Sequence, residues 1–517
     1  MYDLILKGGL VVDGTGSAPQ KANVCISGSR IAAITTQEVA GKEALDVTDL
    51  AVAPGFIDIH SHSDAQPFQS ILPENYLLQG VTTQIVGNCG TAMVPTFSRI
   101  PGQINDYSSS KRGHAGFESV TGYLAGLEEI KPLCNYGTLA GHSNLRSSVL
   151  GYADRIPTEE ELDFMCKTLD AELAAGCFGM SLGLIYPPSS FAEKEELVAL
   201  SKVIAAHDGI LSVHMRNEGP RVFTAVEEML EIARLSGVHL QISHLKLMGK
   251  PQWGKAPQLT AMIEQAKAQG VNVTCDQYPF PASSTALTAL VPRWAADGGT
   301  KAMLERLEHR EGSILADISR EMDNRGGPHC VLIVSGTQGH DEYLGKTIDA
   351  LAKTLCLSPE ETVRQVLLDT AAKPQCIYFS MSEEDIRHIM SKEWVCVGSD
   401  GSDRVIKSAP AIHPRNFATF PQYFQTVREY DILPLEQMVR KATGLTASIL
   451  GLKDRGTLIT GNWADICVFD PQRYKSNATF LVPQKAPEGM YHVLVNGQFA
   501  VKNQALTNAP IGLPLKK

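Results

Sequence analysis

The chain has 517 residues, of which 44% are hydrophobic and 20% are charged, and this balance is typical of a globular protein rather than of a disordered or fibrous one. Its net charge is −10 and it contains no run of Lys or Arg, so it lacks the basic face with which proteins bind nucleic acids. No segment reaches the ~18 uncharged apolar residues of a membrane-spanning helix. We therefore expect neither a nucleic-acid partner nor a membrane partner.

The two ends of the chain share a β-rich pattern. Residues 1–54 contain apolar runs broken by glycine turns, such as LILKGGLVVDG, and residues 453–517 repeat this style in MYHVLVNGQFAV. Short apolar runs bounded by turn residues favour β-strands. We therefore predict one small β domain built from residues 1–54 plus 453–517, with two unrelated β caps as the alternative.

Strand-like and helix-like runs alternate in the middle of the chain. Amphipathic helices are predicted over 158–175, 193–207, 221–236 and 257–269. Eight apolar runs have the pattern of buried strands: 55–62, 82–90, 134–142, 178–184, 210–216, 239–245, 272–280 and 394–401. Eight β-then-α units favour an α/β fold, a (β/α)8 TIM-like barrel over residues 55–452 whose chemistry lies at the carboxyl ends of the strands. A doubly wound open sheet is the competing architecture.

One long stretch interrupts this alternation before the last barrel strand. Residues 281–392 contain helical patterns of their own, such as KAMLERLEH and SPEETVRQVLLDTAA. Loops of this length are usually lids or inserted subdomains. We therefore predict that residues 281–392 form an insertion between strands seven and eight that covers the mouth of the barrel.

Metal-competent side chains end five of the eight predicted strands. Residues two apart in a strand point to the same side, so the two histidines that end the first strand face one point. Imidazole, thiolate and carboxylate groups together suit Zn²⁺, and a catalytic zinc keeps one position open for water. The sequence therefore predicts a zinc site whose ligands are His60, His62, Cys89, His214, His244 and Asp400.

Longer motifs around these positions resemble a known family. The segment APGFIDIHSHSD (53–64), together with the β-rich ends, resembles the amidohydrolase superfamily. The motifs GNCG (87–90), GMSLGLIYPP (179–188), HMRNEG (214–219) and CDQYPF (275–280) resemble its N-acyl-D-amino-acid deacylase (D-aminoacylase) family. In that family a strand-two cysteine replaces the carboxylated lysine that bridges the metals in many relatives. Here residues 179–188 contain no lysine and Cys89 is in place, so both features fit the family.

The resemblance implies a role for each predicted ligand. It implies one tight zinc site made by Cys89, His214 and His244, and possible occupation of a second, weaker site. Asp400 would act as general acid/base, taking a proton from the metal-bound water that attacks the amide and passing it to the departing amine. The second site would use the remaining ligands with the cysteine between them: His60, His62, Asp400 and Cys89.

The resemblance also implies the substrate and how it is held. The small-molecule substrate would be an N-acyl-D-amino acid, hydrolysed to a carboxylate and a free D-amino acid, with its α-carboxylate bound by Lys246, Tyr278 and Arg415. Preference for the D isomer follows from the resemblance alone. After Tyr278 the chain is largely apolar and shows no obvious cation for an acidic substrate side chain, which favours apolar or neutral substrates.

Several alternatives stay open at this stage. A dipeptidase that cleaves before a C-terminal D-residue is hard to separate from a deacylase, whereas a cyclic-amide hydrolase is disfavoured by the missing lysine. A non-catalytic scaffold is least expected, because every ligand is present. Oligomeric state is not predictable, and the odd number of scattered cysteines favours a cytoplasmic protein with free thiols.

Four further features of the sequence lie near the predicted site. His142 ends the third strand and either lines the pocket or orders a loop. Arg216 and Glu218 follow His214 and could orient it through hydrogen bonds. The run Ser283-Ser284-Thr285 resembles a nucleophile cluster, but no GxSxG motif accompanies it, so we expect water to be the attacking group.

Overall fold

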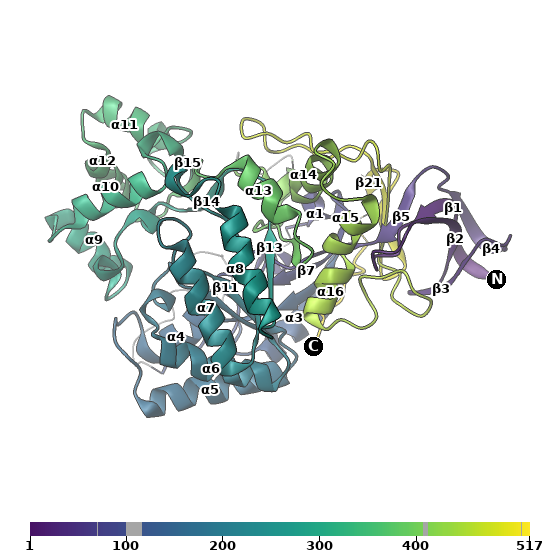
Figure 1. The fold of residues 1–517 in the computed structure, drawn as a ribbon, viewed down its shortest axis with the longest axis horizontal. Helices are drawn as coiled ribbons and strands as arrows, with labels where there is room; N and C mark the ends of the chain where they lie inside the picture. The colour runs from purple at the N-terminus through teal and green to yellow at the C-terminus, as the bar shows by residue number, and fades with distance from the viewer. Residues whose placement is uncertain (70, 100–115, 407–411, 508) are drawn as a thin grey trace.

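The computed structural model describes residues 1–69, 71–99, 116–406, 412–507 and 509–517. Figure 1 shows a small sheet at one end of the molecule, a cluster of helices (α9 to α12) at the opposite end, and a body of strands and helices between them. This body carries the predicted metal ligands.

Both ends of the chain contribute to the small sheet, as predicted. The N-terminal and C-terminal strands join where β5 pairs antiparallel with β18. Leu6, Val24, Ile466 and Leu494 lie in one buried apolar cluster that contains residues of both ends. The N-terminal strands are β1 (Tyr2–Val11), β2 (Gln20–Ser27), β3 (Arg30–Thr35), β4 (Gly41–Asp46) and β5 (Ala51–Pro54). The C-terminal strands are β18 (Ile466–Phe469), β19 (Met490–Val495), β20 (Gln498–Lys502) and β21 (Ala505–Leu506).

The central body contains parallel strands within all eight predicted runs. One sheet has the order β17-β13-β12-β11-β10-β9 and a second has the order β6-β7-β8. The first six strands in chain order are β6 (Phe56–Asp58), β7 (Val81–Val86), β8 (Asn135–Thr138), β9 (Ala140–Gly141), β10 (Gly179–Gly183) and β11 (Ile210–His214). They are followed by β12 (His239–Ile242), β13 (Val273–Gln277) and β17 (Val395–Val397).

These strands do not form one continuous hydrogen-bonded barrel, which corrects the expectation of a closed eight-stranded ladder. The third predicted strand is divided at Leu139, whose N–H donates to Val86 O, so that β8 pairs with β7 whereas β9 pairs with β10. The first and last strands meet only just beyond their ends, through an isolated parallel bridge between Ser61 and Gly401. The chain is thus an α/β protein with two parallel sheets.

The predicted helices between these strands are present. Helix α5 (Glu159–Ala174) begins with a capping box, in which the Thr158 hydroxyl accepts from Glu161 N–H and the Glu161 carboxylate accepts from Thr158 N–H. Helices α6 (Lys194–Ala206), α7 (Val222–Ser236) and α8 (Ala256–Ala268) coincide with the other three predicted ranges. The remaining helices of the body are α1 (Glu74–Leu77), α3 (Val120–Ile130), α4 (His142–Leu150), α14 (Arg415–Glu429), α15 (Leu435–Ala442) and α16 (Gly444–Leu450).

The chain between β13 and β17 builds structure of its own. A three-stranded antiparallel sheet of order β14-β16-β15 packs with four helices around a separate apolar core. The last helix of the segment, α13 (Glu383–Met390), packs against α8 of the body. The other elements are β14 (Ser283–Ala286), α9 (Thr300–His309), α10 (Ile314–Asn324), β15 (Val331–Ser335), α11 (Ile348–Leu355), α12 (Pro359–Asp369) and β16 (Gln375–Tyr378).

Two general features bear on the setting of the protein. Within the part of the chain that the structure describes, no helix has the length and apolar character needed to cross a bilayer. All eleven cysteines are free thiols; nine are buried, Cys166 is partly buried and Cys356 is exposed.

Candidate metal centre

The predicted ligands gather just past the carboxyl ends of the parallel strands, and three of them have an unusual backbone. Cys89 follows β7 with φ of 54°, His244 follows β12 with φ of 37°, and Asp400 follows β17 with φ of 52°. Non-glycine residues rarely adopt this left-handed conformation, and they do so mainly where surrounding structure enforces it at functional sites. At all three strand ends the chain leaves the sheet by way of a strained residue whose side chain enters the cluster.

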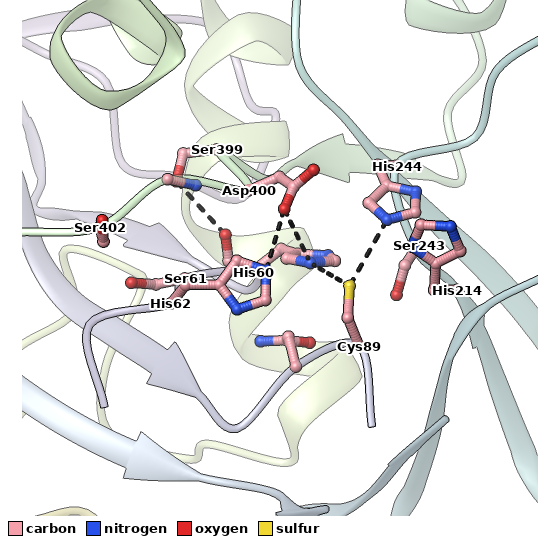
Figure 2. Close-up of polar contacts among 12 residues, drawn as sticks. His60, Ser61, His62, Cys89, His214, Ser243, His244, Ser399, Asp400 and Ser402 are labelled. Carbon is pink, nitrogen blue, oxygen red and sulfur yellow. Dashed lines mark hydrogen bonds and ion pairs between the residues drawn. The ribbon is translucent and has the colours of Figure 1, made fainter. Parts of the chain in front are cut away.

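Four side chains from four different strand ends form the centre of the site. The ligand atoms of His60, Cys89, His244 and Asp400 all lie within 4.8 Å of one another, and all four residues are buried. Figure 2 shows the sulfur of Cys89 between two imidazoles, 3.3 Å from His60 Nε2 and 3.6 Å from His244 Nε2. Asp400 Oδ1 lies 3.6 Å from His60 Nε2 on the other side.

His62 joins this cluster through the carboxylate of Asp400. His62 Nε2 lies 3.0 Å from Asp400 Oδ1, and the His62 side chain is 27% exposed while that of His60 is fully buried. The two histidine rings are 5.4 Å apart. Both imidazoles therefore face Asp400 Oδ1, as predicted, although they lie beyond the end of β6 and not within a strand, and His62 is on the more accessible side.

A second cluster shares His244 with the first. The ligand atoms of His214, Glu218 and His244 also lie within 4.8 Å of one another. The rings of His214 and His244 are 4.4 Å apart, and Glu218 Oε2 lies 3.6 Å from His214 Nε2. The structure thus brings together all six predicted ligands and adds Glu218 to the group.

Electrostatics favour the negatively charged forms of two residues in the centre. Burial by itself raises the pKa of the Cys89 thiol, but the positive charge of His60 and the neighbouring imidazoles hold this pKa well below its usual value. Burial likewise opposes ionisation of Asp400, while the Arg415 charge and the hydrogen bond with His62 keep its pKa well below the ordinary range. The site therefore presents a thiolate and a carboxylate.

Two observations show that this donor set fits a zinc ion. Both ring nitrogens of His214 are buried and make no hydrogen bond with any residue that the structure describes, so they lack the partner that a buried polar atom normally has. Thiolate, imidazole and carboxylate are the three protein ligand types that zinc uses. A cation held by these groups satisfies His214 and offsets the charge of the thiolate and the carboxylate.

Two buried aspartates that the sequence reasoning missed support the ligands. Asp276 in β13 accepts the backbone N–H of His244 at 2.8 Å and lies 3.3 Å from His60 Nδ1. Asp58 in β6 accepts the backbone N–H of His60 at 3.0 Å. An aspartate within a run predicted to be a buried strand is the sequence signal that could have identified both, because a buried carboxylate needs a partner.

The three predicted carboxylate-binding residues lie side by side. Lys246 Nζ and the guanidinium carbon of Arg415 are 5.6 and 5.3 Å from the centre of the Tyr278 ring. Both cations already have carboxylate partners, because Lys246 Nζ is 2.6 Å from Glu218 Oε1 and Arg415 Nη1 is 2.7 Å from Asp400 Oδ2. Lys246 thus contacts one cluster of candidate metal ligands through Glu218, and Arg415 contacts the other through Asp400.

The other residues that the sequence analysis singled out near the site make contacts that stabilise the fold. His142 is fully buried between Ser189 Oγ (2.7 Å) and Glu196 Oε1 (2.9 Å), so it orders the loop after β10. Arg216 pairs with Glu228 and donates to backbone carbonyls, and among the residues that the structure describes it makes no contact with a candidate ligand. The run 283–285 forms most of β14, and Ser284 O accepts a hydrogen bond from Arg415 Nη2.

Comparison with known proteins agrees with this site. The amidohydrolase family model matches residues 43–501. D-aminoacylase of Alcaligenes xylosoxydans xylosoxydans is 32% identical, with 100% of this chain and 98% of the relative covered. N-acyl-D-glutamate deacylase of the same organism is 35% identical, with 96% of this chain and 93% of the relative covered.

A solved structure extends the similarity to the fold. The crystal structure of N-acyl-D-glutamate deacylase from Bordetella bronchiseptica, complexed with zinc and a phosphonate inhibitor, has a TM-score of 0.84 and 32% identity, and the match covers 100% of both chains. Sequence and fold thus agree over the full length. The chain belongs to the amidohydrolase family, and within it to the D-aminoacylase group of N-acyl-D-amino-acid deacylases.

Proposed function

We propose that this protein is a zinc-dependent N-acyl-D-amino-acid deacylase, which hydrolyses the amide of its substrate to a carboxylate and a free D-amino acid. The observation that carries the proposal is the cluster of His60, Cys89, His244 and Asp400 at the strand ends of a chain that matches such enzymes over its full length. Preference for the D isomer is supported by the names of these relatives.

The metal would be held by residues of both clusters. Cys89, His214 and His244 form the tight site, and His60, His62 and Asp400 form the weaker one, with the cysteine between them. When bound, zinc polarises the substrate carbonyl and lowers the pKa of water at the site. Five of the six proposed ligands are buried and His62 is partly exposed, so competing water has limited access to the reacting groups.

Asp400 is the proposed general acid/base. Its carboxylate is ionised and lies within the cluster, 8% exposed, so it can accept the proton of the water that attacks the amide carbonyl. It then delivers this proton to the nitrogen of the departing amine as the C–N bond breaks. His62, at 3.0 Å, holds the carboxylate in place during both transfers.

Lys246, Tyr278 and Arg415 are the proposed clamp for the substrate's α-carboxylate. An arginine can bind a carboxylate with two parallel hydrogen bonds, and a lysine adds a second positive charge. Tyr278 lies between the two cations and its buried hydroxyl makes no hydrogen bond with the residues that the structure describes.

The domain division predicted from the sequence is part of this proposal. We propose that residues 55–452 have a (β/α)8 barrel-like arrangement without a continuous hydrogen-bonded ladder, in which the two sheets adjoin at Leu139 and at the Ser61–Gly401 bridge. Residues 1–54 plus 453–517 form the proposed small β domain. Residues 281–392 form an insertion at the barrel mouth, supported by the contact between Arg415 and β14. A cytoplasmic location is supported by the free thiols.

A substrate panel tests the proposal directly. The purified protein, with its zinc content measured, is incubated with N-acetyl derivatives of D- and L-leucine, methionine, glutamate and aspartate, and the free amino acid is quantified. We expect release from at least one D derivative, little from its L isomer, and none from the Asp400→Asn variant. The absence of amino-acid release from every D derivative by the zinc-loaded protein would contradict the proposal.

A further inference from the structure

The Nδ1 nitrogen of His244 has two neighbours with opposite hydrogen-bonding properties. His244 Nδ1 lies 3.1 Å from Glu218 Oε1 and 2.7 Å from Lys246 Nζ. A carboxylate only accepts hydrogen bonds, whereas an ammonium only donates them. The two side chains therefore favour different protonation patterns of the same imidazole.

These patterns differ in their ability to bind metal. If Nδ1 carries the hydrogen and donates it to Glu218, Nε2 has a free lone pair directed toward Cys89, whose sulfur is 3.6 Å away. If Nδ1 accepts from Lys246, a neutral ring must carry its hydrogen on Nε2, and this nitrogen cannot ligate a cation. Only the tautomer favoured by Glu218 is therefore competent.

We propose that Glu218 is a positioning residue that selects the metal-binding tautomer of His244 against the competing hydrogen bond from Lys246. The proposal rests on His244 being a metal ligand. This role of Glu218, the glutamate of the HMRNEG motif, is distinct from metal ligation and from binding of the substrate's carboxylate.

The surroundings of Glu218 hold it in the position that this role requires. Its side chain is 7% exposed, and Oε1 accepts from Lys246 Nζ at 2.6 Å, so the lysine is drawn toward the carboxylate as well as toward the ring. The backbone oxygen of Glu218 accepts the N–H of Met248 at 2.7 Å, which ties the loop after β11 to the loop after β12. Histidine ligands commonly donate their second N–H to a carboxylate in this way.

Two substitutions with the same change of charge separate selection of the tautomer from simple electrostatics. Glu218→Met removes the charge and the acceptor, whereas Glu218→Gln removes the charge but keeps an oxygen that can accept from Nδ1. Zinc affinity is measured for each by competition with a chromophoric chelator. We expect Glu218→Met to weaken binding by about 10–100-fold, the range typical of lost outer partners of a metal ligand, and Glu218→Gln to weaken it clearly less.

Removal of the Lys246 ammonium, which competes for Nδ1, should restore zinc affinity that is lost in Glu218→Met. In Glu218→Met, Lys246 is the remaining partner of Nδ1 among the described residues, so the double variant Glu218→Met/Lys246→Met should bind zinc more tightly than Glu218→Met. Lys246→Met alone should change zinc affinity only a few-fold. A double variant no tighter than Glu218→Met, or equal losses in Glu218→Met and Glu218→Gln, would overturn the proposal.

A second readout reports the tautomer itself. In metal-free protein labelled with ¹⁵N-histidine, the ring nitrogen shifts of His244, assigned by comparison with His244→Gln, should show hydrogen on Nδ1 in the native chain and on Nε2 in Glu218→Met. The same tautomer in both proteins would contradict the proposal. This measurement needs neither substrate nor metal, so it stands apart from the test of deacylase activity.

Glu228→Met is the matched control. Glu228 also pairs with a cation, Arg216 Nη2 at 3.0 Å, but no contact joins it to a candidate ligand among the described residues. We expect native zinc affinity and native histidine shifts in this variant. A loss of zinc affinity equal to that of Glu218→Met would show that zinc binding depends on negative charge in general. The proposed selective role of Glu218 would then be wrong.

Discussion

Arg415 and Asp400 form a buried ion pair in which Arg415 Nη1 lies 2.7 Å from Asp400 Oδ2. The side chains are 9% and 10% exposed, so water screens this contact poorly. The residue proposed to bind the substrate's carboxylate thus touches the residue proposed to transfer the proton. If these proposed roles hold, substrate binding and proton transfer would be coupled through this one contact.

Arg415→Met is expected to weaken recognition of the α-carboxylate. Loss of hydrogen bonds to a charged group costs about 1.5–3 kcal/mol, which corresponds to a rise in KM of about 10–100-fold. The measurement compares kcat/KM for an N-acetyl-D-amino acid and for its carboxamide, and the preference for the acid should largely disappear. Because Asp400 also loses its partner, kcat should fall as well.

Arg293→Met is the control for this substitution. Arg293 pairs with Asp154 at 2.6 Å, its side chain is 41% exposed, and it should leave the preference between acid and carboxamide unchanged. An undiminished preference in Arg415→Met would contradict the assignment of Arg415 to the clamp.

Asp400→Asn is expected to remove catalysis while it preserves the fold. General acid/base groups accelerate reactions by about 10²–10⁴-fold, so kcat should fall by about this factor or more. The amide can still hydrogen-bond His62, and Cys89, His214 and His244 remain to bind zinc in the tight site. Kinetics and zinc content measured on the same preparation check the prediction. A near-native kcat at full zinc content would refute it.

Gly183→Ala is expected to damage the metal centre from a position that carries no ligand. A Cβ at Gly183, the last residue of β10, would lie 2.2 Å from the backbone oxygen of Cys89, and neither backbone can move away cheaply. We expect the Cys89 loop to shift and zinc affinity to fall by at least about tenfold.

Gly122→Ala in α3 serves as the comparison. A Cβ at Gly122 meets its nearest neighbour at an ordinary 3.7 Å, and alanine favours a helix by about 1 kcal/mol over glycine. This variant should bind zinc normally and melt at an unchanged or higher temperature. Equal zinc affinities in the two glycine variants would show that the Cys89 loop tolerates the added methyl group.

Lys441 is expected to make stability depend on pH. Burial lowers the pKa of Lys441 from 10.5 to about 7, and its ammonium donates to Met390 O and Lys392 O. Between these two pH values the unfolded chain binds a proton that the folded chain does not, so stability rises with pH across this window and is flat below it. The midpoint of thermal unfolding should therefore increase between pH 7.5 and 9.5.

Two lysine variants check this origin. Lys441→Met should lose most of the increase in the unfolding midpoint, because the group that titrates is gone. Lys301→Met, whose side chain is 92% exposed in the native protein, should keep it. The same pH dependence in Lys441→Met and in the native protein would assign the effect to other groups.

The sequence by itself determined the parts of the protein that depend on local pattern. Apolar runs located all eight central strands, and the chemistry of His60, His62, Cys89, His214, His244 and Asp400 predicted a zinc site, because ligand type and strand position are both readable along the chain. The pairing of the two β-rich ends followed from their similar patterns.

Tertiary structure alone decided which partners these residues have. Glu218 and Lys246 compete for one nitrogen of His244, Asp276 supports two ligands, and Arg415 contacts Asp400, although none of these contacts follows from spacing. The break at Leu139 was likewise invisible in the sequence, since hydrogen-bond partners of a strand are set by its neighbours. The physical reason is that a side chain's type is local, while its hydrogen bonds depend on where distant segments pack.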